Sequence, residues 1–215
     1  MKWIIFPLML WSLLWAENPQ KISKEILEKT SQKYLSSTSL QGDFKYVLID
    51  KIKKKDLVKT GNFKIKGEKY RLTLENPDMI IFFNGKKRVS YRVAEKEYEY
   101  LEDEENIFNM QEVLKNYETN YRYHLAKEVE VNGKMCYVMV LKPKAQAQEE
   151  HDLEHSKVQV ELFISKHTYE IQKMVTQEAN ERQIILEVFT LKSNEPLKDQ
   201  QFDFKPEDYP GAEQI

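Results

Sequence analysis

The chain has one cysteine and six glycines among its 215 residues. A single cysteine cannot supply the paired disulfides that staple small secreted domains, so packing alone must hold the fold. Cys136 lies in the apolar segment 135–141, which predicts a buried side chain rather than a nucleophile. The sequence contains no Gly-x-Gly-x-x-Gly, Walker-type or Gly-x-Ser-x-Gly motif. This argues against phosphate-cradling loops and a serine-hydrolase nucleophile.

The chain also lacks a strong excess of either charge, since 33 basic and 35 acidic residues leave a net charge of −2. Nucleic-acid-binding proteins carry a basic footprint, so no nucleic-acid partner is expected. A polybasic tract next to an apolar helix is the pattern of a stable contact with an anionic membrane. The sequence contains no such tract. The short lysine-rich run 51–55 is followed by Asp56. We interpret this run as a solvated hairpin tip.

Histidines and acids give little sign of catalysis. His151 and His155 are spaced as two ligands on one helical face would be, but zinc proteases need Glu after the first His, and Asp152 stands there. The surrounding segment 144–156 is predicted to be a polar surface loop. A catalytic pair of carboxylates needs surroundings that push the two pKa values apart. Clustered acids such as 102–105 have no such hydrophobic surroundings in the sequence, which favours a role in solubility and turns. We therefore expect no metal, no cofactor and no enzymatic activity.

The N-terminus has the layout of a secretory signal peptide. Lys2 provides a positive charge, residues 3–15 are almost all apolar, and the small Ala16 precedes a polar segment. A membrane anchor is the rival interpretation, but the apolar run is shorter than the ~20 residues that span a bilayer. We expect residues 1–16 to be a cleaved signal peptide and residues 17–215 to form a single secreted domain. All three tryptophans lie in the first segment.

The first half of the remaining chain begins with a helix and continues as strands. Asn18 can cap a helix whose first residue is Pro19, and apolar residues at helical spacing predict an amphipathic helix over 19–36. From Gly42 the apolar pattern changes to a period of two, which is typical of half-buried antiparallel strands. Strands are predicted near 44–49, 63–66, 70–75, 79–83, 88–94 and 97–101, with a hairpin turn at Asn84-Gly85.

A short helix then interrupts the strands. It begins near Asn109 and carries one apolar stripe, Met110, Val113, Leu114 and Tyr117. Further strands are predicted near 120–131, 134–142, 158–164, 169–178 and 182–192. The sum is a mainly β protein with some α: an antiparallel meander of about ten or eleven strands, curled into an open or partly closed barrel, with two amphipathic helices to cover one face.

Aromatic residues recur at one parity along the predicted strands, from Phe44 to Tyr123. An ordinary barrel core explains this pattern and comes first on general grounds. A concave apolar sheet that holds a lipid-like ligand, with the helices as a movable lid, explains it as well. Composition alone leaves both interpretations open.

The order of the motifs resembles the outer-membrane lipoprotein carrier (LolA) family over essentially all of residues 17–215. The most specific piece is the C-terminal segment, Phe202-Asp203-Phe204-Lys205-Pro206 followed by 209–213. The other matching pieces are Ile26-Leu27-Glu28-Lys29 leading to Tyr34, Gly42-Asp43-Phe44, 61–66, 69–72, Asn84-Gly85-Lys86 with Tyr91 after it, and Leu141-Lys142-Pro143. Two places depart from the family. Val89 stands where a Trp is common, and Gly67-Glu68 replaces the Arg-Pro whose Arg bonds the lid shut in the best-known members.

The resemblance implies a periplasmic protein, an unclosed barrel with a helical lid that ferries acylated lipoproteins from the inner to the outer membrane. An inner-membrane ABC-type lipoprotein-releasing complex would supply the cargo, and an outer-membrane lipoprotein receptor would accept it. We expect a monomer whose lid is formed by Met110, Val113, Leu114 and Tyr117. The residues expected to contact lipid are Phe44, Tyr46, Phe63, Ile65, Tyr70, Leu72, Leu74, Ile81, Phe83, Tyr91, Val160, Leu162 and Ile164.

Two other functions remain open at this point. One is a lipid- or lipoprotein-sensing regulatory module of related fold, which binds a membrane protein instead of moving cargo. The other is a periplasmic lipid-modifying enzyme, which would need an essential carboxylate or histidine inside the cavity. The missing Arg-Pro means that any latch on the lid must use other residues.

Overall fold

The structure is a computed structural model that describes residues 18–52, 54–75, 78–101, 110–144, 157–179 and 181–215. The predicted signal peptide (residues 1–16), the helix cap Asn109, the acidic cluster 102–105 and the His151/His155 pair lie outside the described residues. Among the described residues no group of His, Cys, Asp or Glu side chains could hold a metal ion. None of the helices in these ranges is long and apolar enough to cross a membrane.

Thirteen strands form one sheet in the part of the chain that the structure describes, and two α-helices accompany it. The elements in order are α1 Pro19–Leu35, β1 Leu40–Asp50, β2 Lys55–Lys66, β3 Lys69–Glu75, β4 Met79–Phe83, β5 Arg88–Arg92, β6 Glu97–Leu101, α2 Met110–Asn120, β7 Tyr121–Val131, β8 Lys134–Pro143, β9 Lys157–Ser165, β10 Ile171–Glu178, β11 Arg182–Val188, β12 Lys192–Ser193, the 3-10 helices η2 Asp199–Phe202 and η3 Pro206–Asp208, and β13 Glu213–Gln214.

The sheet is not closed. Its order is β13-β6-β5-β4-β3-β2-β1-β11-β10-β9-β8-β7, with β12 attached to β1, so β13 and β7 are the two outer strands. The pairings are antiparallel except for the parallel pair of β13 and β6. This confirms the predicted unclosed, mainly antiparallel barrel, and the eleven longer strands agree with the expected number. The sequence did not predict the two-residue strands β12 and β13.

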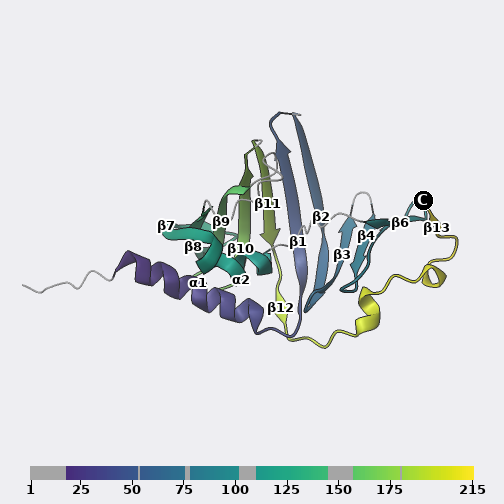
Figure 1. Cartoon of the computed structure of the whole chain (residues 1–215), viewed down its shortest axis with the longest axis horizontal. Coiled ribbons are helices and arrows are strands. Elements are labelled where there is room, and N and C mark those ends of the chain that lie inside the picture. Colours follow the sequence, from purple (N-terminus) through teal and green to yellow (C-terminus); the bar gives the residue numbers. More distant parts are fainter. Residues whose placement is uncertain (1–17, 53, 76–77, 102–109, 145–156, 180) are drawn as a thin grey trace, which may run out of the picture.

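The chain makes one long crossing between the two halves of the sheet. Strands β1 to β6 run outward to one edge, and β7 begins at the opposite edge, from which the strands return until β11 pairs with β1. The segment between β6 and β7 contains α2. A simple meander was predicted, but the crossing means that α2 is brought to the sheet by the connection itself. Figure 1 shows both helices along the lower side of the β7–β11 half.

Helix α1 follows the expected rules at its start. The Asn18 side chain accepts a hydrogen bond of 3.0 Å from the backbone N–H of Gln20, and Pro19 occupies the first turn. The helix ends at Leu35, one residue before the predicted end. Its buried residues include Ile26, Leu27 and Tyr34. These side chains attach α1 to the inner face of the sheet.

Helix α2 buries the predicted stripe: Met110, Val113, Leu114 and Tyr117 are all buried. Its C-terminal carbonyl groups receive hydrogen bonds from Lys144. The Lys144 backbone N–H donates to the carbonyl of Asn120 at 2.8 Å, and its ammonium group donates to the carbonyl of Glu118 at 2.8 Å. A cation at this end of a helix is favourable because the helix dipole is negative there.

Candidate functional site

The candidate site is the apolar inner face of the sheet together with the two helices that cover it. Of the residues expected to contact lipid, ten are buried in one cluster with the α2 stripe: Phe44, Phe63, Ile65, Tyr70, Leu72, Leu74, Ile81, Val160, Leu162 and Ile164. Tyr46 and Phe83 pack against the same cluster and are partly buried. The structure therefore brings together twelve of the thirteen residues.

Strand register explains why these residues share a face. Residues directly opposite in adjacent antiparallel strands project to the same side of the sheet. Tyr70 lies opposite Phe83 and Leu72 lies opposite Ile81. The Tyr70 and Phe83 ring centroids are 5.2 Å apart. The alternation in β3 and its register with β4 thus continue one apolar surface from strand to strand.

Tyr91 is the exception, and the prediction that it contacts lipid on the inner face is wrong. It lies opposite Ile80, which alternates with Ile81 and therefore projects from the other face. Tyr91, Ile80 and Phe82 form a second buried cluster, and Phe204 and Tyr209 of the C-terminal segment pack against it. The Phe204 and Tyr209 rings are stacked at 5.2 Å, and Tyr91 lies 4.6 Å from Tyr209.

Helix α2 is held to its neighbours by three kinds of contact. The Ser31 hydroxyl of α1 donates a hydrogen bond of 3.0 Å to the carbonyl of Leu114. Lys24 of α1 forms an exposed ion pair of 2.9 Å with Glu118. The Tyr117 ring lies edge-on at 5.4 Å from Tyr123 of β7. Apolar packing dominates this attachment, since exposed ion pairs contribute little to stability.

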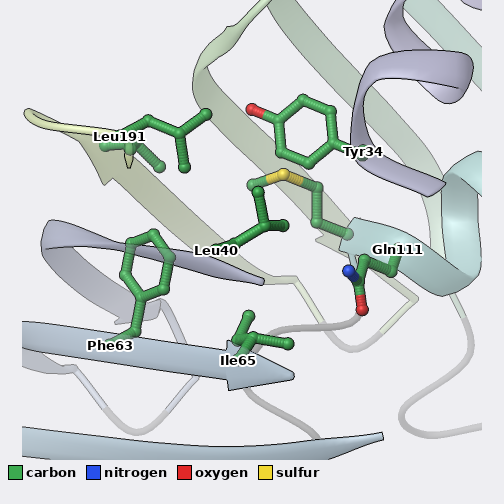
Figure 2. Close-up of a pocket in the computed structure, with 8 residues that line it drawn as sticks. Tyr34, Leu40, Phe63, Ile65, Gln111 and Leu191 are labelled. Carbon is green, nitrogen blue, oxygen red and sulfur yellow. The ribbon is translucent and has the colours of Figure 1, made fainter. Parts of the chain in front are cut away.

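A pocket lies where the two helices meet β1 and β2. Its lining comes from Tyr34, Leu40, Phe63, Ile65, Met110, Gln111, Val188 and Leu191. It encloses about 310 Å³ of space, part of which is open to solvent. Figure 2 shows Phe63 and Ile65 on the strand below, with Tyr34 and Gln111 on the helices across from them. Because this volume includes open solvent, the enclosed hollow is small for a ligand pocket, which typically has ~300–1,000 Å³.

Few polar groups face this pocket. The Tyr34 hydroxyl accepts a hydrogen bond of 3.0 Å from the backbone N–H of Ile171. Burial is the main cause that raises the pKa of Tyr34 far above its usual value, so it stays protonated. Gln111 supplies the amide. An apolar lining with neutral polar groups suits a hydrocarbon ligand rather than a charged one.

The remaining candidates for chemistry lie away from the pocket. Cys136 is fully buried, as predicted, and its Sγ donates to the carbonyl of Lys134 at 3.4 Å. Burial is the main cause that raises the pKa of this thiol, which makes it a poor nucleophile. His124 and His167 are exposed on the surface.

Sequence reasoning missed four apolar residues and one polar residue of the pocket: Tyr34, Leu40, Val188, Leu191 and Gln111. A signal was available for Leu40, which precedes Phe44 by four residues and shares its parity in β1. Val188 lies opposite Phe44 in β11, and only the pairing of β1 with β11 reveals this. That pairing joins segments about 140 residues apart, so no local pattern predicts it.

Comparison with solved structures identifies the same fold in several proteins of low sequence identity. A conserved protein of Thermus thermophilus matches with a TM-score of 0.56 and 15% identity, over 90% of this chain and 98% of that chain. The lipoprotein LppX of Mycobacterium tuberculosis matches with a TM-score of 0.53 and 9% identity, over 83% of this chain and 98% of that chain. The Pseudomonas aeruginosa MucA/MucB complex matches with a TM-score of 0.51 and 13% identity, over 86% of this chain and 62% of that chain.

Sequence comparison with curated proteins gives no match. The sequence pattern of a protein family does match. That pattern describes the outer membrane lipoprotein carrier protein LolA, and it covers residues 36–205, from the end of α1 to the C-terminal aromatic segment. This span includes the inner face of the sheet, α2 and the outer cluster around Tyr91. The chain therefore belongs to the LolA family.

Proposed function

We propose that the protein is a carrier that binds the acyl chains of lipoproteins between the inner face of the sheet and its two helices. The observation that carries this proposal is the buried apolar face that ends in a pocket with an apolar lining. The family of the chain and its binding-protein fold support a binding function of this kind. Phe44, Phe63 and the other inner-face residues would contact the acyl chains.

Binding requires the helices to move. The pocket has about 310 Å³ of space, which is small for several acyl chains. Helix α2 is the element that can leave, because its attachment to α1 and β7 combines apolar packing with only a few polar contacts. Each methylene group that enters the apolar space contributes ~0.8 kcal/mol. The acyl chains would therefore replace the α2 stripe Met110, Val113, Leu114 and Tyr117 against the sheet.

The signal-peptide layout of residues 1–16 and the family of the chain support a cellular setting for this function. We propose that residues 1–16 direct secretion and are removed, and that residues 17–215 act as a single-domain monomer in the periplasm. Cargo would come from an inner-membrane ABC-type lipoprotein-releasing complex and pass to an outer-membrane lipoprotein receptor. The protein would carry the lipid without changing it chemically, because the described residues that line the pocket include neither a carboxylate nor a histidine.

The test is release of lipoproteins from spheroplasts of the organism from which the chain comes. The protein is added, and newly made lipoproteins in the supernatant are measured as one-to-one complexes with intact lipid. Leu191→Trp places a large ring in the pocket, and Phe189→Trp places the same ring at an exposed position two residues away. We expect release with the unchanged chain and with Phe189→Trp, and at least a several-fold loss with Leu191→Trp.

The same assay separates the other functions. Lipid binding by the folded protein without release of lipoproteins would indicate a sensing module and overturn the carrier proposal. Lipid that returns chemically changed would indicate a lipid-modifying enzyme. Equal release by both tryptophan variants would show that the pocket is not where the acyl chains bind.

A further inference from the structure

The β1–β2 hairpin extends past the rest of the sheet. Its strands pair from Leu40 opposite Ile65 up to Asp50 opposite Lys55. Strand β3 pairs with β2 only from Thr60 onward. Among the described residues, no strand pairs with residues 55–59 of β2 on that side. Figure 1 shows the β1–β2 hairpin reaching beyond the β10–β11 hairpin beside it.

This end of the hairpin is apolar on both faces and exposed. The exposed fractions are 67% for Ile52, 52% for Val58 and 38% for Leu57. Leu57 and Val58 are consecutive, so their side chains project from opposite faces. Leu57 lies opposite Leu48, and Val58 lies opposite Val47. Three exposed aliphatic side chains gathered at one projecting end provide apolar surface that a contact with another body would bury.

The exposed charge at the turn is mainly positive. Lys51 and Lys54 are exposed on either side of Ile52, within the lysine-rich run 51–55. Neither lysine forms an ion pair with another described residue. Asp50, at the end of β1, is only 7% exposed. Asp56 is the exposed acid nearest the turn.

We propose that this hairpin end contacts the surface of an anionic phospholipid bilayer. Ile52 enters the headgroup region, Leu57 and Val58 cover the two sides of the inserted end, and Lys51 and Lys54 face lipid phosphates. A narrow end with apolar side chains on both faces fits a bilayer, which surrounds what enters it, better than a protein partner that would cover one face. Lysines near an anionic surface strengthen such binding through attraction to the lipid phosphates.

The sequence alone pointed to a solvated hairpin tip, because the lysine run is short. The structure adds what the run does not show, namely the exposed aliphatic residues beside it and the projection of the strands. The inference goes beyond the proposed carrier function and does not depend on it. Binding to vesicles that contain no lipoprotein tests the hairpin, whereas capture of lipoproteins tests the pocket.

The first experiment measures binding to vesicles by sedimentation, with the chain starting at Glu17, which keeps every described helix and strand. Vesicles of phosphatidylglycerol and phosphatidylcholine are compared with vesicles of phosphatidylcholine alone. We expect binding to the anionic vesicles that weakens with salt, and at least a ~10-fold lower partition coefficient for K51E/K54E. The matched control is K127E/K142E, which reverses two exposed lysines on β7 and β8. Equal losses for the two double variants would overturn the proposal.

The second experiment asks whether residue 52 enters the bilayer. The chain from Glu17 onward contains no tryptophan, so Ile52→Trp introduces the only indole. We expect its fluorescence to shift to the blue with anionic vesicles, and no shift for Phe189→Trp, which is exposed elsewhere. Ile52→Asp should bind several-fold less than Ile215→Asp, which changes a similarly exposed isoleucine at the C-terminus. No shift at residue 52, or no binding by the folded unchanged chain, would refute a bilayer contact.

Discussion

The hydroxyl of Ser31 donates a hydrogen bond of 3.0 Å to the carbonyl of Leu114, and this bond joins α1 to the middle of α2. Leu114 itself is fully buried against the sheet. The same residue of α2 is therefore fixed on one side by packing and on the other by a polar contact. If α2 is the part that opens, this bond is one of those that must break.

Ser31→Ala should loosen α2 without changing the fold. A typical intramolecular hydrogen bond contributes about 0.5–1.5 kcal/mol net, so the loss of global stability should be small. The local effect should be larger, and we expect faster amide hydrogen exchange in residues 110–120. Ser37→Ala is the control, because the Ser37 hydroxyl, just past the end of α1, donates to the carbonyl of Lys33 in that helix. Unchanged exchange in α2 for Ser31→Ala would show that packing alone holds the helix.

Leu114→Ala should test how much the buried Leu114 side chain contributes to the packing of α2. A buried Leu replaced by Ala costs about 2–5 kcal/mol, with the cost set by how far the site can collapse. We expect a lower midpoint in denaturant with the fold retained. Lys115→Ala changes the neighbouring exposed residue of α2 and should stay within ~0.5 kcal/mol of the unchanged chain. Similar midpoints for the two variants would mean that the α2 stripe adds nothing to stability.

Much of the fold could be predicted from the periodicity of apolar residues. Which face of the sheet a given set of residues projects from could not. Alternation correctly placed Tyr70, Leu72 and Leu74 on one face of β3. Helical spacing correctly identified the four buried apolar residues of α2. Alternation also places Val89 and Tyr91 together, but it does not say on which side of the sheet they project. The side is set by the register between β4 and β5, in which Phe83 lies opposite Arg88.

A signal for the second face was nevertheless present. Residues 79–83 are continuously apolar, which is typical of a strand buried on both faces. Some other segment then had to cover Ile80 and Phe82, and the C-terminal residues Phe204 and Tyr209 do so. The pocket residue Val188 had no comparable signal, because its place depends on a pairing between distant strands.

Phe204→Ala should release the C-terminal segment without affecting the inner face. Phe204 contacts Phe82, Tyr91, Tyr98 and Tyr209 through its ring, all on the outer cluster. A fully buried Phe replaced by Ala costs about 3–5 kcal/mol, and Phe204 is partly buried, so a smaller loss is expected. We expect limited proteolysis to cut within residues 203–215, while lipoprotein capture persists. Loss of capture in the folded variant would show that the outer cluster also shapes the pocket.

Asp199 makes a second attachment of the C-terminal segment sensitive to acid. Its carboxylate lies 2.6 Å from the ammonium of Lys66 and 2.8 Å from that of Lys69. Hydrogen bonds from these two lysines are the main cause that lowers the pKa of Asp199 from 3.8 to about 2. Because the folded-state pKa is the lower one, the stabilisation is complete above pH ~4 and is lost as the pH falls through about 2.

Asp199→Asn should therefore lower the free energy of unfolding at neutral pH. In strong acid the variant and the unchanged chain should be equally stable. The effect should be small, because the ion pairs are exposed to solvent and screened by salt. Denaturant midpoints measured between pH 2 and pH 7 would show the two curves converging as the pH falls below ~4. Asp208→Asn, in the same segment, removes a carboxylate that forms no ion pair with a described residue and should run parallel to the unchanged chain. Curves for Asp199→Asn that stay parallel down to pH 2 would show that the lysines do not hold this segment through its charge.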